Sequence, residues 1–170
     1  MAHGAQDITV GTTIYLALGS NLGDRRAMLD GAAARLDAAG VTVAARSRLY
    51  ETDAVADEPQ PAYLNAVLRA TTVLPARPLM ELCLTVERAL GRVRPAGRRK
   101  AARSIDIDLL LYGAAVIDDA PALSVPHPAL LERPFVRIPL ADVASPGLRH
   151  PVTGERLDQA PPSPGVRVIP

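Results

Sequence analysis

Hydrophobic side chains recur along this chain with two different periods, and the two periods alternate. Residues 14–18 form a short apolar run that ends at Gly19, which is typical of a buried strand. Residues 24–39 carry four apolar side chains at helical spacing: Leu29, Ala32, Ala33 and Leu36. Gly40 is placed to end that helix. The first unit is therefore predicted to be a strand followed by a helix.

The pattern then changes to strict alternation. Apolar and polar side chains alternate over residues 41–49, which predicts a second strand with one face in the core. Residues 52–61 hold acidic side chains and two prolines without a period, so we expect a loop there. Residues 64–74 resume as a run rich in β-forming residues. Together these segments predict a long hairpin.

A second helix is predicted after this hairpin. Pro78 suits a first helical turn, and five residues form an apolar stripe before the stop at Gly91: Leu79, Leu82, Cys83, Val86 and Leu90. A basic loop, a strand over residues 105–112 and a short helical stretch around residues 135–143 follow. This order predicts an α+β fold with a ferredoxin-like βαββαβ core, an α/β sandwich with an antiparallel sheet.

Both ends of the chain lack such a period. We expect residues 1–11 and about 158–170 to be irregular, because the segment 145–170 carries six prolines and three glycines. A length of 170 residues with 48% hydrophobic content suits one globular domain that can bury a substantial core. Residues 1–170 are therefore predicted to form a single domain.

Charge and cysteine content narrow the class of protein. Nineteen basic and eighteen acidic side chains leave a net charge of +1, which gives no argument for a nucleic-acid or membrane partner. The lone Cys83 cannot form an internal disulfide, which fits a reducing compartment. The apolar run at 14–18 is too short for a signal peptide or a membrane span. We expect a cytoplasmic protein, and a monomer.

Candidate chemistry begins with two acids in the last predicted strand. Strand geometry sends Asp106 and Asp108 to one face, while the alternating apolar residues Ile105, Ile107 and Leu109 point to the other. Like charges this close repel unless a cation lies between them, and carboxylate oxygens suit Mg²⁺ that carries nucleotide phosphates. The alternative is an exposed strand that merely displays two acids, which is common for an isolated Asp-x-Asp.

A group of cations precedes this acidic pair. Residues 88–103 hold seven of them and no acid: Arg88, Arg92, Arg94, Arg98, Arg99, Lys100 and Arg103. Such a run is usually a solvated surface, but arginines beside a metal-binding pair can neutralise a phosphate group during its transfer. No P-loop, dinucleotide fingerprint, zinc-protease motif or nucleophile elbow occurs. The residues predict transfer of a phosphate group from a magnesium nucleotide and leave the acceptor open.

Five separated motifs occur in a characteristic order: ALGSNLGD at 17–24, YLNAV at 63–67, GRVR at 91–94, RSIDIDLL at 103–110 and VPHP at 125–128. From about Ile14 to Leu157 the chain closely resembles the 6-hydroxymethyl-7,8-dihydropterin pyrophosphokinases of folate biosynthesis. The resemblance implies ATP as pyrophosphate donor, two Mg²⁺ ions, a hydroxymethyl-dihydropterin acceptor and AMP as a product. It also implies attack of the hydroxymethyl oxygen on the β-phosphorus.

The resemblance further implies a role for each of several residues. Asp106 and Asp108 match metal ligands, and with the triphosphate-contacting Arg92 and Arg103 they form the implied catalytic set. Four further positions are implied for ATP: Arg94, Arg99, His127 and Arg133. Six are implied for the pterin: Thr52, Asp53, Val55, Tyr63, Asn65 and Phe135. Aromatic faces and an amide that offers both a donor and an acceptor suit a flat polar heterocycle.

Simpler explanations and other classes stay open. Phe135 alone is typical of a core residue, and His127 between two prolines could cap the next turn. Where the family usually has Arg-Trp-Gly-Pro-Arg, residues 99–103 are Arg-Lys-Ala-Ala-Arg, and the chain holds no Trp. A related protein that binds ATP or a pterin with weak or altered activity is one alternative. An RNA-binding module is another, disfavoured because the strands lack a run of base-stacking aromatics.

Overall fold

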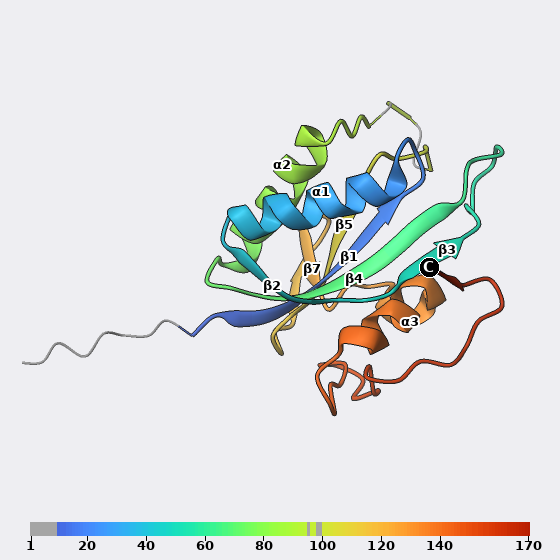
Figure 1. The fold of residues 1–170 in the computed structure, drawn as a ribbon. Coiled ribbons are helices and arrows are strands. Elements are labelled where there is room, and N and C mark those ends of the chain that lie inside the picture. The colour runs from blue at the N-terminus through green and yellow to red at the C-terminus, as the bar shows by residue number, and fades with distance from the viewer. Residues whose placement is uncertain (1–9, 95, 98–99) are drawn as a thin grey trace, which may run out of the picture.

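The computed structural model describes residues 10–94, 96–97 and 100–170, and in this part of the chain a six-stranded antiparallel sheet forms the centre (Figure 1). Its strands are β1 (Thr12–Ser20), β2 (Val41–Arg46), β3 (Leu49–Thr52), β4 (Tyr63–Thr72), β5 (Asp106–Tyr112) and β8 (Arg167–Ile169). They lie in the order β5-β1-β4-β3-β8, and β2 also pairs with β4. If β2 and β3 are taken as one interrupted strand, this is the ferredoxin-like order.

Helices cover both faces of the sheet. Helices α1 (Arg25–Ala38) and α2 (Ala76–Ala89) lie on one face, and α3 (Pro134–Val143) lies on the other (Figure 1). A small hairpin of β6 (Ile117–Asp119) and β7 (Leu123–Val125) and a 3-10 turn, η1 (Leu130–Glu132), precede α3. Among the described helices, none combines the length and the apolar character that crossing a membrane requires. The predicted α+β class with its antiparallel sheet is confirmed.

Alternation along the strands supplies both faces of the sheet with core residues. In β1, Leu16 packs toward α1 and α2 while its neighbour Tyr15 packs toward α3. In β5, Leu109 and Leu110 divide in the same way. Because each strand contributes to two apolar layers, the sheet is buried on both sides and forms a firm base for the residues at its edge.

The second predicted strand is divided in two. Ser47 causes the break: its backbone N–H donates to the Val67 carbonyl (2.9 Å), and its hydroxyl accepts the Val67 N–H (2.9 Å) in place of a backbone carbonyl. The chain resumes as β3, which extends to Thr52. The residue that we expected to open a loop is therefore the last residue of a strand.

The expectation of an irregular C-terminal segment is wrong at its end. Residues 167–169 form β8, which pairs with β3 and places Tyr50 opposite Val168. Without β8, β3 would present an open row of N–H and C=O groups at the sheet edge. The prolines at 161, 162 and 164 all precede this strand, so they do not interrupt it.

Candidate active site

The two predicted carboxylates begin β5 and lie on the side of the sheet that α3 covers. Ile107 and Leu109 pack toward α1 and α2, so Asp106 and Asp108 point to the opposite face. The register places Asp106 opposite Gly19 of β1, and Gly19 opposite Asn65 of β4. One row across three strands thus joins a predicted metal ligand to a predicted pterin-binding amide.

A cavity of about 330 Å³ opens over this row. Its lining residues come from β3 and the loop after it, β4, β5, the arginine-rich segment and the start of α3: Thr52, Asp53, Val55, Gln60, Tyr63, Asn65, Lys100, Arg103, Asp106, Asp108, Arg133 and Phe135. We call Arg103, Asp106, Asp108 and Arg133 the charged half of the cavity. We call Thr52, Tyr63, Asn65 and Phe135 its polar half. All six residues predicted for the pterin line this one cavity.

In the charged half, the ionic groups already have partners. The Arg92 Nη1 and Asp106 Oδ1 atoms are 2.5 Å apart, and the Arg103 Nη1 and Asp106 Oδ2 atoms are 2.8 Å apart. The Arg133 guanidinium lies 3.9 Å from Asp108 Oδ2. Burial and the nearby charge of Asp106 raise the pKa of Asp108 above its usual value. A cation that enters between the two carboxylates would therefore reduce their mutual repulsion.

Arg92 does not line this cavity, and its side chain pairs with a buried acid, Glu87. Its guanidinium lies 2.7 Å from Glu87 Oε1, and both side chains are almost fully buried. Glu87 also accepts the backbone N–H of Ile107 (2.8 Å), and burial raises its pKa. Glu87 thus connects α2, Arg92 and the start of β5. Sequence reasoning missed it, although an acid four residues after Cys83 on the buried stripe of α2 was a usable signal.

The other described residues predicted for ATP do not line the main cavity. Arg94 and Arg92 line a smaller cavity of about 230 Å³, with the Arg94 Nη2 atom 3.7 Å from Glu87 Oε2. Arg99 falls outside the described residues. His127 accepts the Ala129 N–H at Nδ1 (3.1 Å), and burial together with the charge of Arg133 lowers its pKa. His127 is therefore a neutral side chain close to the charged half.

Hydrogen bonds and burial fix the side chains of the polar half. The Asn65 amide is buried and donates to the Thr52 hydroxyl (2.9 Å). Burial raises the pKa of Tyr63, which keeps its hydroxyl neutral. The ring of Phe135 packs partly against the core under α3, and the Arg133 guanidinium lies 5.7 Å from the ring centroid. That Tyr63 and Phe135 enclose a ring between them stays a prediction.

Gly19 is a second residue that sequence reasoning missed as part of the site. It lies in β1 between Asn65 and Asp106, so it separates the two halves of the cavity. A methyl group there would lie 3.4 Å from Asn65 Oδ1 and 3.7 Å from Tyr63 Cδ1, which are ordinary contacts. A glycine inside a strand often marks a close approach by a ligand, and this was the available signal.

Asn21 joins the loops around the cavity. It is buried and donates to Gln60 Oε1 (3.2 Å) and to the Pro61 carbonyl (3.1 Å). Its Oδ1 atom accepts the backbone N–H of Arg103 (2.7 Å). Gln60 in turn donates to the Lys100 carbonyl (2.5 Å). The loop before β4 and the arginine-rich segment are therefore linked directly across the cavity.

The donor set fits magnesium that is shared with a phosphate ligand. In the described ranges, no three His, Cys, Asp or Glu side chains are grouped to hold a metal by themselves. Asp106 and Asp108 instead offer hard carboxylate oxygens at one cavity wall, which is how Mg²⁺ is bound when phosphates and water complete its coordination.

Fold and cavity together define a class: a ferredoxin-like α+β protein in which one cavity joins a charged half, suited to phosphates, to a polar and aromatic half. The particular family follows from comparison. The sequence model of the family 7,8-dihydro-6-hydroxymethylpterin-pyrophosphokinase (HPPK) matches residues 15–145, and the chain belongs to this family. The resemblance inferred from the five motifs is thereby confirmed.

Individual relatives agree with this assignment. The chain is 47% identical over 134 residues to the 2-amino-4-hydroxy-6-hydroxymethyldihydropteridine pyrophosphokinase of Methylorubrum extorquens, covering 78% of this chain and 83% of that protein. It is 41% identical over 155 residues to the protein of the same name from Bacillus subtilis, covering 91% and 88%. The solved structure of wild-type Plasmodium falciparum HPPK-DHPS shares the fold, with a TM-score of 0.64 at 14% identity. That match covers 91% of this chain and 44% of the longer one.

Proposed function

We propose that this chain transfers pyrophosphate from ATP to the hydroxymethyl group of 6-hydroxymethyl-7,8-dihydropterin in folate biosynthesis, and that it releases AMP. The observation that carries the proposal is the shared cavity in which Asp106 and Asp108 of β5 are separated from Asn65 of β4 by one strand, β1. A donor phosphate and a flat acceptor can therefore meet over Gly19. Such proximity accounts for a large part of the rate in group transfer.

The charged half would hold the triphosphate. Asp106 and Asp108 would bind Mg²⁺, with two ions proposed, and the metal would neutralise and orient the phosphate oxygens. Arg103 and Arg133 face the cavity and would contact the same phosphates. Because Arg92 and Arg103 now pair with Asp106, ligand binding would exchange those partners for phosphate oxygens. We also propose ATP contacts for Arg94, Arg99 and His127.

The polar half would hold and orient the acceptor. Asn65 and Thr52 are fixed by their mutual hydrogen bond, so they present polar atoms to the pterin at little entropic cost. Tyr63 and Phe135 would offer their rings to its faces, and the backbone from Asp53 to Val55 would complete the wall. The hydroxymethyl oxygen would then attack the β-phosphorus and release its proton to solvent, and the bond from that phosphorus to the oxygen of the leaving AMP would break.

We further propose that the protein acts as a monomer in the cytoplasm. The described residues of one chain supply both halves of the cavity, so no second copy is needed to complete it. The lone Cys83 is buried, and burial raises the pKa of its thiol to about 12, so it is unreactive.

The proposal is tested by measuring AMP formation from Mg·ATP with and without a panel of pterin alcohols. We expect AMP to form in a 1:1 ratio with the pterin diphosphate, and only when both Mg²⁺ and the acceptor are present. AMP formation without the acceptor would contradict the proposal. Calorimetric binding of both substrates without turnover would instead favour the related protein with weak or altered activity.

A further inference from the structure

The segment beyond residue 145, where the match to the family ends, lies beside the wall of the cavity. We call residues 146–170 the tail. Its strand β8 pairs with β3, and Glu51 lies opposite Arg167. The next residue of β3 is Thr52, whose hydroxyl accepts the Asn65 amide at the cavity. The tail is therefore one strand away from the polar half.

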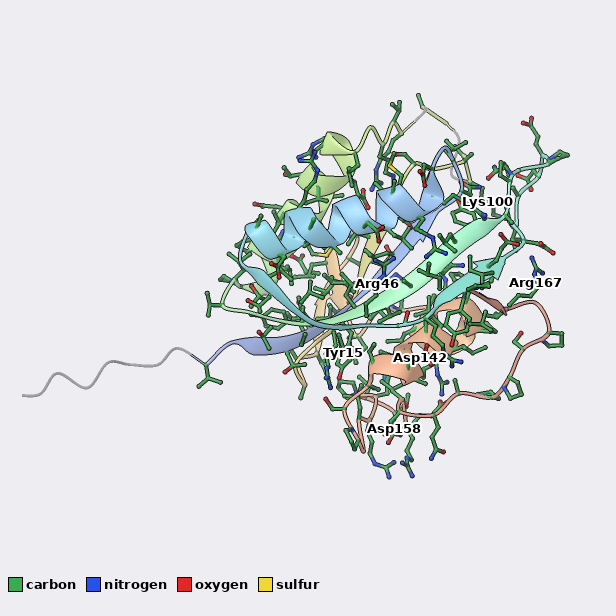
Figure 2. The ribbon with its side chains drawn as sticks, in the orientation of Figure 1. Tyr15, Arg46, Lys100, Asp142, Asp158 and Arg167 are labelled. Carbon is green, nitrogen blue, oxygen red and sulfur yellow. The ribbon has the colours of Figure 1, made fainter. Side chains whose placement is uncertain are left out.

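One tail side chain reaches the residues on either side of Thr52. The Arg167 Nη2 atom donates to Asp53 Oδ1 (3.1 Å) and lies 3.5 Å from Glu51 Oε1. Figure 2 shows Arg167 beside β3, on the side where the loop after β3 projects. Glu51 is also held by Arg25 of α1, at 2.9 Å. A single guanidinium thus attracts the carboxylates that flank Thr52, which restrains the backbone between them.

The strand that carries Arg167 is itself fixed in place. Ile169 packs against the core between the sheet and helices α1 and α2. The Arg26 guanidinium donates to the Pro170 carbonyl (2.6 Å). Farther back in the tail, the Arg137 side chain donates to the Arg156 carbonyl (3.2 Å). Because the tail is attached at several points, Arg167 is presented to β3 by a paired strand.

We propose that the tail is part of the acceptor site and that Arg167 is a positioning residue for it. Arg167 does not line the cavity, so it acts through Glu51 and Asp53 on Thr52 and the backbone that follows. The inference rests on the proposed function, because the acceptor is the pterin of that reaction. In the described chain Arg167 pairs with Glu51 and Asp53, which lie outside the charged half, so we expect phosphate binding to be independent of it.

The kinetic test uses the full chain with Arg167→Gln. We expect the KM for the pterin alcohol to rise about 2- to 5-fold, the range for an exposed ion pair, with kcat and the Kd of a non-hydrolysable ATP analogue unchanged. Arg167→Lys keeps the charge and should restore part of the affinity. The matched control is Arg156→Gln, which removes another tail arginine paired with an acid, Asp158, away from the cavity. That control should leave KM unchanged.

A second measurement is independent of the reaction. Amide hydrogen exchange over residues 50–55 should be faster in Arg167→Gln than in the wild type or in Arg156→Gln, with no substrate present. Unchanged exchange overturns the positioning role, and faster exchange with an unchanged KM overturns its link to the acceptor. An equal KM rise in the Arg156 control also overturns it. A wild-type chain that binds no pterin would overturn the proposed function instead, while exchange still decides whether Arg167 restrains β3.

Discussion

The two halves of the cavity are built in different ways. In the charged half, Asp106 touches two arginines, so the groups that would bind ligand are occupied by each other. In the polar half, Asn65 and Thr52 are fixed by a hydrogen bond that leaves the cavity wall in place. The first half must exchange partners when a ligand enters, whereas the second half is already arranged to receive one.

Because of this difference, we expect the charged half to determine the rate of transfer and the polar half to determine which acceptor binds. Without ligand, the ion pairs of the charged half leave no buried charge unpaired. When a ligand binds, the same arginines can exchange their partners for phosphate oxygens and neutralise the charge of the ligand. A preformed polar wall instead selects an acceptor by shape and hydrogen bonding. Substitutions in the charged half should therefore lower kcat, and substitutions in the polar half should weaken acceptor binding.

The largest expected effect comes from removing one carboxylate of the charged half. We expect Asp106→Asn or Asp108→Asn to lower kcat by at least ~100-fold, the loss that follows removal of one electrostatic contact to the transition state. Single-turnover rates at several Mg²⁺ concentrations measure it. Asp118→Asn, which changes an exposed acid on β6, is the control. Near wild-type turnover with unchanged Mg²⁺ dependence would contradict the proposal that Asp106 and Asp108 bind Mg²⁺.

A methyl group between the two halves should have the next largest effect. Gly19→Ala makes only ordinary contacts with Asn65 and Tyr63, so the fold should survive. The added group occupies the floor where donor and acceptor would meet, and we expect kcat/KM for the pterin to fall about 10-fold or more. Steady-state kinetics with a parallel melting curve measure this. If Gly19→Ala keeps full activity, the ligands do not approach β1, and both halves must bind farther out.

In the polar half, the expected loss is confined to the acceptor. Asn65→Ala removes the hydrogen bond to Thr52, and Phe135→Leu removes the ring while keeping an apolar side chain against the core under α3. We expect each to raise the pterin Kd about 10-fold, the value of one or two kcal/mol of lost contacts. Calorimetry with an ATP analogue provides the control. Equal weakening of both ligands would indicate general damage and would erase the distinction between the halves.

Much of the fold was predictable because period and spacing are local properties. The alternation of Asp106 and Asp108 with apolar neighbours determined which face of β5 they occupy, and the order of elements determined the sheet. The six pterin positions came from resemblance, and they line one cavity here. Periodicity alone could not bring Thr52 and Phe135 together, because their meeting depends on how α3 packs under the sheet.

What the sequence did not predict depends on contacts between distant segments. The role of Glu87 is established by its buried pairing with Arg92, and that of Asn21 by its bonds to two other loops. The strand β8 escaped prediction because three residues after a proline-rich stretch carry too short a pattern. Its pairing exists because the edge of β3 is available, which is a property of the assembled sheet.

The smallest effect is expected at the joint between β3 and α3, two of the three elements that carry the polar half. Asp142 lies on α3 (Figure 2). It accepts the Tyr50 hydroxyl (2.9 Å) and pairs with Arg48 (2.8 Å), so it ties α3 to β3. Burial opposes its charge, but the hydrogen bonds from Arg48 and Tyr50 outweigh it and lower the pKa of Asp142. Because its pKa is lowered in the folded state, the carboxylate stabilises the fold at pH values above its ordinary pKa, which is near 4.

Asp142→Asn should therefore lower the Tm by about 2–4 °C at pH 7, as expected for about 1 kcal/mol in a chain of this size. The stabilisation by the wild-type carboxylate is lost as pH falls through its lowered pKa, so the two melting curves should converge below about pH 4. Glu81→Gln, an exposed acid on α2, is the control. Because β3 and α3 carry Thr52 and Phe135, Asp142→Asn should also weaken pterin binding slightly and leave ATP-analogue binding unchanged. A Tm difference that is constant between pH 3 and 7 would show that the carboxylate's charge does not hold the two elements together.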